Sequence, residues 1–312
     1  MKSDVVVHDL AKAFGDVAAL EGVSFDVRTG ELFGFIGSDG AGKTTLLRIL
    51  TTLLLPDRGS AEVLGRDVVS DMWELRRRVG YMPGRFSLYP DLSVAENLSF
   101  FASVFGTTVE AQYERIAPIY RQIEPFADRR AGALSGGMKQ KLALSCALVH
   151  EPEILFLDEP TTGVDAVSRR EFWDMLQDLR DAGLTIVVST PYMDEADRCE
   201  RVALIDGGRI LRIDAPDALG REYGHPLLAV HGAVGGDRAR LLRVLRGLPH
   251  AESVYPFGET LHFTDRRAGA DPRALAHDLL EALTDAGLSG AHVEPIEPGI
   301  EDVFMSLMGR AS

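Results

Sequence analysis

The sequence is poor in cysteine and contains no long hydrophobic run. Only two cysteines, Cys146 and Cys199, occur among 312 residues, and neither has a neighbouring metal-type ligand. A disulfide framework and a cysteine-based metal site are therefore excluded, and each thiol is expected to be a small buried group in a reducing compartment. No apolar stretch approaches the roughly 20 residues that a bilayer span needs, and the N-terminus lacks the order of a signal peptide. We therefore expect that this chain cannot cross a membrane alone.

Basic residues are also in short supply. The chain has 33 Lys and Arg against 47 Asp and Glu, which gives a formal net charge of −14. Such a chain repels the phosphate backbone, so general nucleic-acid binding is excluded and no nucleic-acid partner is expected. Binding of a nucleotide stays open, because that needs only local hydrogen-bond donors and a metal ion. The apolar fraction of 46% is ordinary for a globular protein.

The first half of the chain changes from strand to helix character. Residues 4–36 contain short apolar runs separated by turn residues, which predicts antiparallel strands that lead into a strand at 31–36. A glycine-rich loop follows, and the periodicity of residues 44–54 predicts a helix. Helical periodicity then dominates residues 93–147. This shift predicts a strand-rich part followed by a helical part.

The second half contains a parallel-sheet pattern, which is followed by a separate set of predicted helices and strands. Two apolar runs of strand length, 153–158 and 184–190, flank an amphipathic helix at 167–181, which predicts a buried parallel sheet. After about residue 220 the pattern starts again, with predicted helices near 237–248 and 272–286 among short strands. We therefore predict an α/β domain over 1–219 and a small α+β domain over 220–312, the latter a dimerisation or stability module.

A phosphate-binding loop is predicted at residues 37–44. The run GSDGAGKT fits G-x-x-x-x-G-K-[ST], follows a predicted strand and opens a predicted helix. Backbone N–H groups and the helix N-terminus would hold the phosphates, while Lys43 reaches the β- and γ-phosphates and Thr44 holds Mg²⁺. The alternative is a tight glycine turn with an incidental lysine. The predicted nucleotide-binding residues here are Gly37, Ser38, Asp39, Gly40, Ala41, Gly42, Lys43, Thr44 and Thr45.

Two adjacent carboxylates end the strand at 153–158. Asp158 is placed to hold Mg²⁺ through water, and Glu159 is the candidate that polarises an attacking water. The pair could instead cap the following helix. Neighbouring carboxylates repel each other, however, and a cation relieves that repulsion. We therefore predict that Glu159 and Lys43 are catalytic and that Thr44 and Asp158 hold the metal.

The run LSGGMKQ at residues 134–140, about twenty residues before the LDEP run, is typical of ABC ATPases. Over residues 4–215 the chain resembles the nucleotide-binding subunits of ABC exporters of the drug-resistance type. The resemblance implies a P-loop NTPase core, with a mixed sheet, an antiparallel β subdomain and a helical subdomain at about 85–147. It also implies that ATP and Mg²⁺ are bound between two subunits in a head-to-tail dimer.

Several residues gain expected roles from this resemblance. The signature residues Ser135, Gly136, Gly137 and Gln140 would contact the ATP held by the opposite subunit, and the loop 161–165 would connect the two sites, with Asp165 at the interface. Phe14 matches the aromatic residue that stacks on adenine in the family. A core position for Phe14 is the alternative.

Two positions depart from the family pattern. Gly84 stands where the family usually has a glutamine that touches the metal and the attacking water, and Pro191 stands where it has a histidine that donates to the γ-phosphate. Neither Arg85 nor Tyr192 is expected to substitute. We therefore predict ATP-dependent dimerisation with slow hydrolysis at the site built on this chain, in a homodimer or in a heterodimer with a second ABC ATPase. An ATP-clamped regulatory protein with little hydrolysis is the alternative function.

Membrane partners follow from the same resemblance. Residues 85–133 look like the helical subdomain whose groove receives a helix from the permease, and Ser93 with Glu96 fits a helix-capping box. For the apolar residues Phe86 and Leu88 the alternatives are exposed contact with the membrane subunit or core packing. The tail 298–304 looks like that of exporter subunits. The resemblance thus implies a peripheral protein on the cytoplasmic face of the membrane, which powers a permease.

Overall fold

The computed structural model describes residues 2–85, 88–232, 237–288 and 290–311. The chain forms two compact units, residues 1–215 and 216–312. The boundary that the sequence predicts, between residues 219 and 220, falls inside helix α7 (Pro216–Arg221). In the part of the chain that the structure describes, no helix is both long and apolar enough for a bilayer span.

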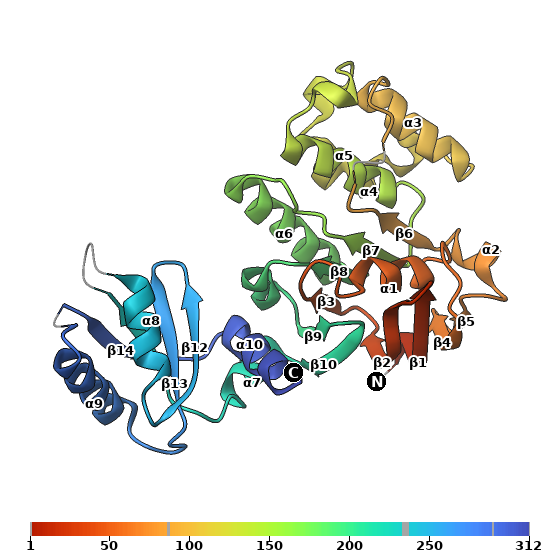
Figure 1. The fold of residues 1–312 in the computed structure, drawn as a ribbon. Coiled ribbons are helices and arrows are strands. Elements are labelled where there is room, and N and C mark those ends of the chain that lie inside the picture. Colours follow the sequence, from red (N-terminus) through yellow and green to blue (C-terminus); the bar gives the residue numbers. More distant parts are fainter. Residues whose placement is uncertain (1, 86–87, 233–236, 289, 312) are drawn as a thin grey trace. The chain divides into compact units, whose positions relative to one another are not determined.

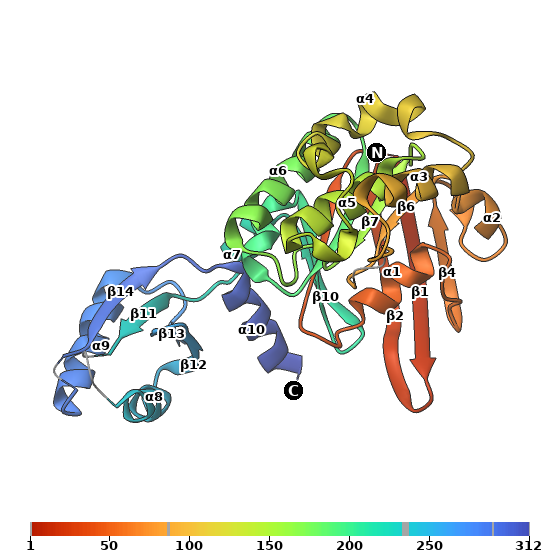
Figure 2. The same ribbon diagram turned by 90° about the horizontal axis from the view of Figure 1, so that it is seen from above.

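The first unit begins with an antiparallel sheet of order β2-β1-β4-β5. Its strands are β1 (Ser3–Phe14), β2 (Val17–Arg28), β4 (Arg58–Val63) and β5 (Arg66–Asp67). Figure 2 shows β1 and β2 as a long hairpin. Alternate residues of β1 such as Val5 and Val7 are buried, because one face of the sheet packs on the core and the other faces water. The antiparallel strands expected near the N-terminus are therefore present.

The second sheet of this unit is mostly parallel and has the order β10-β9-β3-β8-β7-β6. Its strands are β3 (Leu32–Ile36), β6 (Val79–Met82), β7 (Ile154–Asp158), β8 (Thr185–Thr190), β9 (Arg201–Asp206) and β10 (Arg209–Asp214), and only β10 runs antiparallel to its neighbour. Every residue of β3, β7 and β8 is buried. The carboxyl ends of these three strands lie side by side, and this is where ligands bind in open α/β sheets.

Helices α1 and α6 pack against this sheet. Helix α1 (Lys43–Leu50) buries its leucines in a core that also contains Phe33 and Phe35 of β3. It ends before residue 54, the expected limit, because Thr52 takes a left-handed conformation with φ 62°. Helix α6 (Ala166–Asp181) matches the predicted amphipathic helix and buries Phe172 and Trp173.

The helical part of this unit lies beyond β6 (Figure 1). It contains α3 (Val94–Val104), α4 (Val109–Tyr120) and α5 (Gly136–Leu148), while the short α2 (Met72–Leu75) precedes β6. The predicted capping box is confirmed: Glu96 N donates to Ser93 Oγ at 3.1 Å, and Ser93 N donates to Glu96 Oε2 at 2.7 Å. Three-residue 3₁₀ helices, Glu124–Phe126 and Ala131–Ala133, connect α4 to α5. A six-residue 3₁₀ helix, Met193–Arg198, precedes β9.

The second unit is a small α+β domain, as predicted. Its antiparallel sheet has the order β12-β13-β11-β14. After α7, the elements in chain order are β11 (Leu227–His231), α8 (Arg238–Arg246), β12 (Ala251–Phe257), β13 (Thr260–Asp265), α9 (Pro272–Asp285), β14 (His292–Ile296) and α10 (Ile300–Ala311). Residues such as Leu245, Phe263 and Leu279 form its core, so the unit has a hydrophobic core of its own.

Both cysteines are buried free thiols, Cys146 in α5 and Cys199 before β9. Burial raises the pKa of each thiol well above its ordinary value, so both stay protonated at pH 8. Because the thiolate is the reacting species, we expect the native chain to react with a disulfide reagent at least roughly 100-fold more slowly than the guanidinium-unfolded chain. A colorimetric thiol assay in both states measures this. Rapid labelling of the native chain would contradict the burial of these residues.

Candidate nucleotide site

The loop at residues 37–42 joins the carboxyl end of β3 to α1, and close backbone packing explains its glycines. A Cβ on Gly37 would lie 2.1 Å from the carbonyl oxygen of Ile205, and a Cβ on Gly42 would lie 2.4 Å from that of Ala19. Gly42 also has φ 103°, a conformation that side chains disfavour. The loop is therefore fixed in a tight curve over the N-terminus of α1, with backbone N–H groups there available for an anion.

Lys43 lies under this loop. Its side chain is only 3% exposed, and Nζ donates to the carbonyl oxygens of Gly37 at 2.8 Å and Ser38 at 3.0 Å. Nζ is also 3.3 Å from Oε1 of Glu159. The structure therefore brings the two predicted catalytic residues together at the mouth of the loop.

The remaining loop residues form its rim. Asp39 and Gly40 are exposed, and the hydroxyl of Ser38 donates to Asp206 at the end of β9 at 3.1 Å. The other predicted residues are Ala41, which is buried, and Thr45, which is half-buried in the first turn of α1.

Asp158 and Thr44 form an oxygen pair that fits Mg²⁺. Thr44 Oγ1 donates to Asp158 Oδ1 at 3.0 Å, and Asp158 is 3% exposed. No cluster of three or more His, Cys, Asp or Glu side chains that could hold a metal occurs among the described residues. A hydroxyl and a carboxylate are suitable ligands for Mg²⁺, which usually takes its remaining ligands from water and substrate phosphates. The residues present therefore fit this ion.

Ser189, which the sequence analysis did not single out, holds the carboxylate pair in place. Its hydroxyl donates to Asp158 Oδ1 at 2.8 Å and accepts from the backbone N–H of Glu159 at 3.1 Å. This second bond helps to hold Glu159 in a left-handed conformation with φ 48°. A serine near the end of an otherwise apolar strand was the signal that could have found it.

The two departures from the family pattern lie beside this pair. Gly84 approaches so closely that a Cβ on it would be 2.8 Å from the carbonyl oxygen of Asp158. Pro191 follows β8 directly and has neither a donor side chain nor a backbone N–H. The ring of Tyr192 is covered by the guanidinium of Arg169 at 5.0 Å, which keeps this tyrosine engaged elsewhere.

The signature residues lie at the start of α5. Ser135 caps this helix, because its Oγ accepts from the backbone N–H of Met138 at 3.3 Å. Ser135 and Gly136 are exposed, Gly137 is buried and Gln140 is half-buried. Cβ atoms on the glycines would meet the loop before α6 and its first turn: one on Gly136 would lie 3.3 Å from the carbonyl oxygen of Gly163, and one on Gly137 would lie 2.5 Å from Ser168 Oγ. The signature thus packs on the loop and helix that follow Glu159.

Phe14 ends β1 and is 53% exposed, so the core alternative is wrong for it. The ammonium of Lys12 lies 5.7 Å from the centre of its ring. An exposed ring next to a cation is suited to stacking on a flat ligand, and its proposed contact with adenine stays a prediction.

An apolar groove of about 440 Å³ lies between β6 and the helical part of this unit. We call it the β6 groove; its lining includes Leu53, Leu88, Phe101, Val104, Phe105 and His150. Of the two alternatives for Leu88, core packing is confirmed, because this residue is 5% exposed and lines the groove. Phe86 lies outside the described residues.

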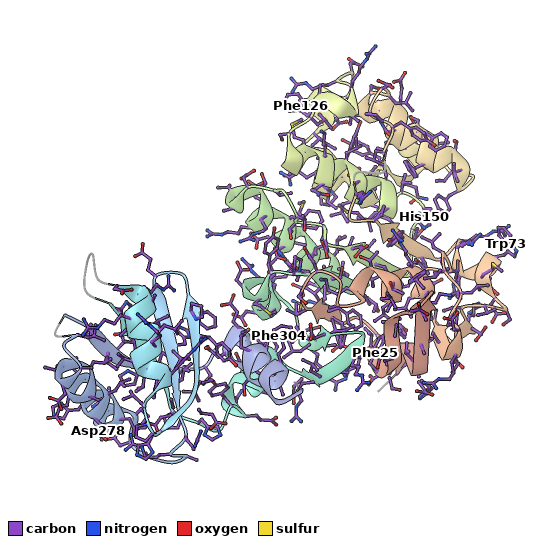
Figure 3. The ribbon with its side chains drawn as sticks, in the orientation of Figure 1. Phe25, Trp73, Phe126, His150, Asp278 and Phe304 are labelled. Carbon is purple, nitrogen blue, oxygen red and sulfur yellow. The ribbon has the colours of Figure 1, made fainter. Side chains whose placement is uncertain are left out.

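His150, labelled in Figure 3, is one of the residues that line the β6 groove. Burial lowers the pKa of this histidine, the ring of Phe105 stacks on it at 3.8 Å, and its Nε2 lies 3.2 Å from the carbonyl oxygen of Val79. Burial also raises the pKa of Tyr81, another lining residue, to about 12. Around this lining Leu53, Val104 and Phe105 stay partly exposed, so the groove offers an apolar surface to a partner.

Comparisons with known proteins identify the family of this chain. Residues 20–162 match the family model described as ABC transporter. The chain is 38% identical over 311 residues to the probable multidrug ABC transporter ATP-binding protein YbhF of Escherichia coli. The matched region covers 98% of this chain but only 52% of YbhF, so the chain spans about half the length of this relative. It is 35% identical to the Nod factor export ATP-binding protein I of Ralstonia nicotianae, with 97% of this chain and 93% of the relative covered.

Solved structures of ABC cassettes are similar to about two thirds of this chain. CbiO1 from Clostridium perfringens, part of the ABC transporter complex cbiONQ, has a TM-score of 0.64 and 26% identity, over 71% of this chain and 92% of that one. The dimeric post-hydrolysis state of the ATP-binding cassette MJ0796, bound to ADP and Pi, has a TM-score of 0.61 and 26% identity, over 68% of this chain and 98% of that one. The P-loop fold and the ABC resemblance inferred from the sequence are thereby confirmed.

Proposed function

Because the chain belongs to the ABC transporter family of ATP-binding proteins, we propose that it is the ATP-binding and ATP-hydrolysing subunit of a membrane exporter. The observation that carries this proposal is the meeting of three groups at the ends of β3, β7 and β8: the loop with buried Lys43, the Thr44–Asp158 pair, and Glu159. Relatives named for multidrug and Nod factor export support the direction of transport. Titration with a fluorescent ATP analogue in the presence and absence of Mg²⁺ tests the binding step.

Each group of the site has a defined task in this proposal. The loop amides and Lys43 bind the phosphates, and Thr44 and Asp158 would hold Mg²⁺, which when bound neutralises phosphate charge. Glu159 orients and polarises the attacking water, with Ser189 holding its backbone. Phe14 stacks on the adenine ring. Thus this chain supplies one face of an ATP site.

The opposite face comes from a second subunit. The exposed tip at Ser135 and Gly136 can meet the γ-phosphate bound to another chain in a head-to-tail dimer. Closure of two subunits around ATP would move a permease, and hydrolysis would reopen them. Because Gly84 and Pro191 replace the glutamine and histidine that the family uses at these positions, we propose slow hydrolysis at the site built on this chain. A heterodimer with a second ABC ATPase uses the intact signature, while a slow homodimer or an ATP-clamped regulator is the alternative.

We propose that the β6 groove receives a segment of the permease, which would place the protein peripherally on the cytoplasmic face of the membrane. Val104 lines the groove and is 62% exposed, so an apolar partner side chain can reach it. Replacing Val104 with Asp is expected to reduce recovery of the permease by about 10-fold, because docking would bury a charge against an apolar surface. Affinity purification from solubilised membranes, with quantitative mass spectrometry, measures this.

Val69→Asp is the matched control, since Val69 is 41% exposed and is not a lining residue of the β6 groove. Both variants should bind MgATP like the wild type. Equal loss of the permease from both variants, or from neither, would refute the β6 groove as the docking site.

A further inference from the structure

A buried carboxylate connects two segments that flank the nucleotide site. Glu195 is 3% exposed, and its two oxygens accept from different threonines: Oε1 from Thr161 Oγ1 at 2.8 Å and Oε2 from Thr190 Oγ1 at 2.5 Å. Thr161 and Thr190 are themselves 1% and 0% exposed. We call these three residues the Glu195 cluster. A buried carboxylate is costly unless it is hydrogen-bonded, so the cluster strongly favours a single arrangement.

Helix α6 adds a cation to the Glu195 cluster. Arg169 Nε lies 3.7 Å from Glu195 Oε1, another nitrogen of its guanidinium donates to Asp194 at 3.0 Å, and the guanidinium covers Tyr192. Thr190 also accepts from the backbone N–H of Tyr192 at 3.0 Å. The segment that follows β8 is therefore bound both to the strand end and to α6.

Each threonine of the cluster lies next to a functional segment. Thr190 ends β8, directly after Ser189, which holds Asp158 and Glu159. Thr161 begins the loop that runs to Asp165, and Asp165 caps α6 by accepting from the backbone N–H groups of two residues in its first turn. Glu195 thus joins the catalytic edge of the sheet to this loop.

The same loop supports the signature. Gly136 packs on the carbonyl oxygen of Gly163, and Gly137 packs on Ser168 so closely that neither glycine position has free space for a Cβ. A shift of the loop would therefore displace the tip of α5. A continuous chain of contacts runs from the end of β8, through Glu195 and Thr161, to the signature.

We propose that Glu195 is a positioning residue which, by holding Thr161 and Thr190 together, keeps the signature tip aligned with the catalytic edge of the same chain. The inference rests on the proposed function, in which that tip completes the ATP site of a second subunit. The Glu195 cluster thus couples two ATP sites. One is the site on this chain that contains Asp158 and Glu159, and the other is the site of the second subunit that the signature tip of this chain completes.

The test compares Thr161→Val, which removes the hydroxyl and keeps the shape, with Thr161→Ser, which keeps the hydroxyl. Both are made in the Glu159→Gln background, where slow turnover lets MgATP-bound dimers accumulate, and dimerisation is measured by analytical ultracentrifugation. A misplaced signature tip should raise the dimer dissociation constant of Thr161→Val by about 10- to 100-fold, while Thr161→Ser stays near the parent. Affinity of the monomer for a fluorescent ATP analogue should stay unchanged in both.

Thr185→Val is the matched structural control. Thr185 is a buried threonine at the opposite end of β8. Its hydroxyl donates to Asp4 at 2.6 Å and accepts from the backbone N–H of Gly30 at 2.7 Å, so its loss removes a threonine–carboxylate bond, and one further bond, away from the site. Equal dimerisation of Thr161→Val and Thr161→Ser, or an equal defect in Thr185→Val, would overturn the role of Glu195. Failure of the parent itself to bind MgATP would instead refute the proposed function, and failure to dimerise with MgATP bound would exclude the homodimer that this test uses.

Discussion

Replacing Lys43 with methionine is expected to lower the affinity for MgATP by about 100-fold. The Lys43 side chain is 3% exposed, and its ammonium donates to the carbonyl oxygens of Gly37 and Ser38 in the phosphate loop. Charge-assisted hydrogen bonds to phosphate oxygens contribute roughly 1.5–3 kcal/mol each, so losing two corresponds to about 3 kcal/mol or more, or 100-fold in affinity. Methionine retains the apolar stem, which keeps the packing of α1. Titration with a fluorescent ATP analogue measures the change.

The variant also leaves Glu159 without its cation at 3.3 Å, so its fold must be checked by thermal unfolding. Lys141→Met is the matched control. Lys141 of α5 forms an ion pair with Glu171 of α6 at 2.7 Å, and the loss of this lysine should leave nucleotide binding by the monomer intact. Wild-type affinity in a folded Lys43→Met chain would remove the phosphate loop from the proposed mechanism.

The phosphate loop was predictable from the sequence because its chemistry is contiguous. The glycines that permit the tight curve, Lys43 and Thr44 are neighbours in the chain, and a strand and a helix flank them. Asp158 was predictable for a related reason. A carboxylate that ends a buried parallel strand must lie at the same edge of the sheet as other strand ends.

The Glu195 cluster was not predictable in the same way. Thr161 and Glu195 are 34 residues apart, and their contact depends on where β8 lies in the sheet. The observed order β3-β8-β7 places β8 between the strand of the phosphate loop and the strand of Asp158. Sequence patterns indicate that strands exist and are buried, whereas strand order depends on how the connecting helices pack.

The burial of single apolar residues in the segments around β6 could also not be predicted from the sequence. For Leu88 the sequence left contact with the membrane subunit and core packing open, and it is buried in the β6 groove, while Val104 and Trp73 are 62% and 71% exposed. These side chains lie in segments around β6 whose mutual packing decides which side chains are covered. Periodicity within one helix does not contain that information.

Restoring the family residue at position 191 is expected to accelerate ATP hydrolysis. Pro191→His introduces an imidazole donor directly after β8, beside the edge that carries Asp158 and Glu159. One correctly placed donor to a transition-state oxygen contributes about 100-fold or more in kcat. The gain should appear in kcat for phosphate release, with little change in affinity for MgATP, because Lys43 and the loop that bind the phosphates are untouched.

Gly84→Gln should give a smaller gain. Its Cβ would begin 2.8 Å from the carbonyl oxygen of Asp158, so the backbone must shift before the amide can reach the attacking water. The effects of the two restorations are expected to be non-additive, because both would act on the same phosphate and water. Pro191→Ala and Gly84→Ala separate the effect of the new functional group from that of the altered backbone. Each gain should vanish when Glu159→Gln is added, since that carboxylate polarises the water in every variant. If the wild-type chain alone already hydrolyses ATP rapidly, or if Pro191→Ala accelerates hydrolysis as much as Pro191→His, the missing donor does not limit turnover at this site.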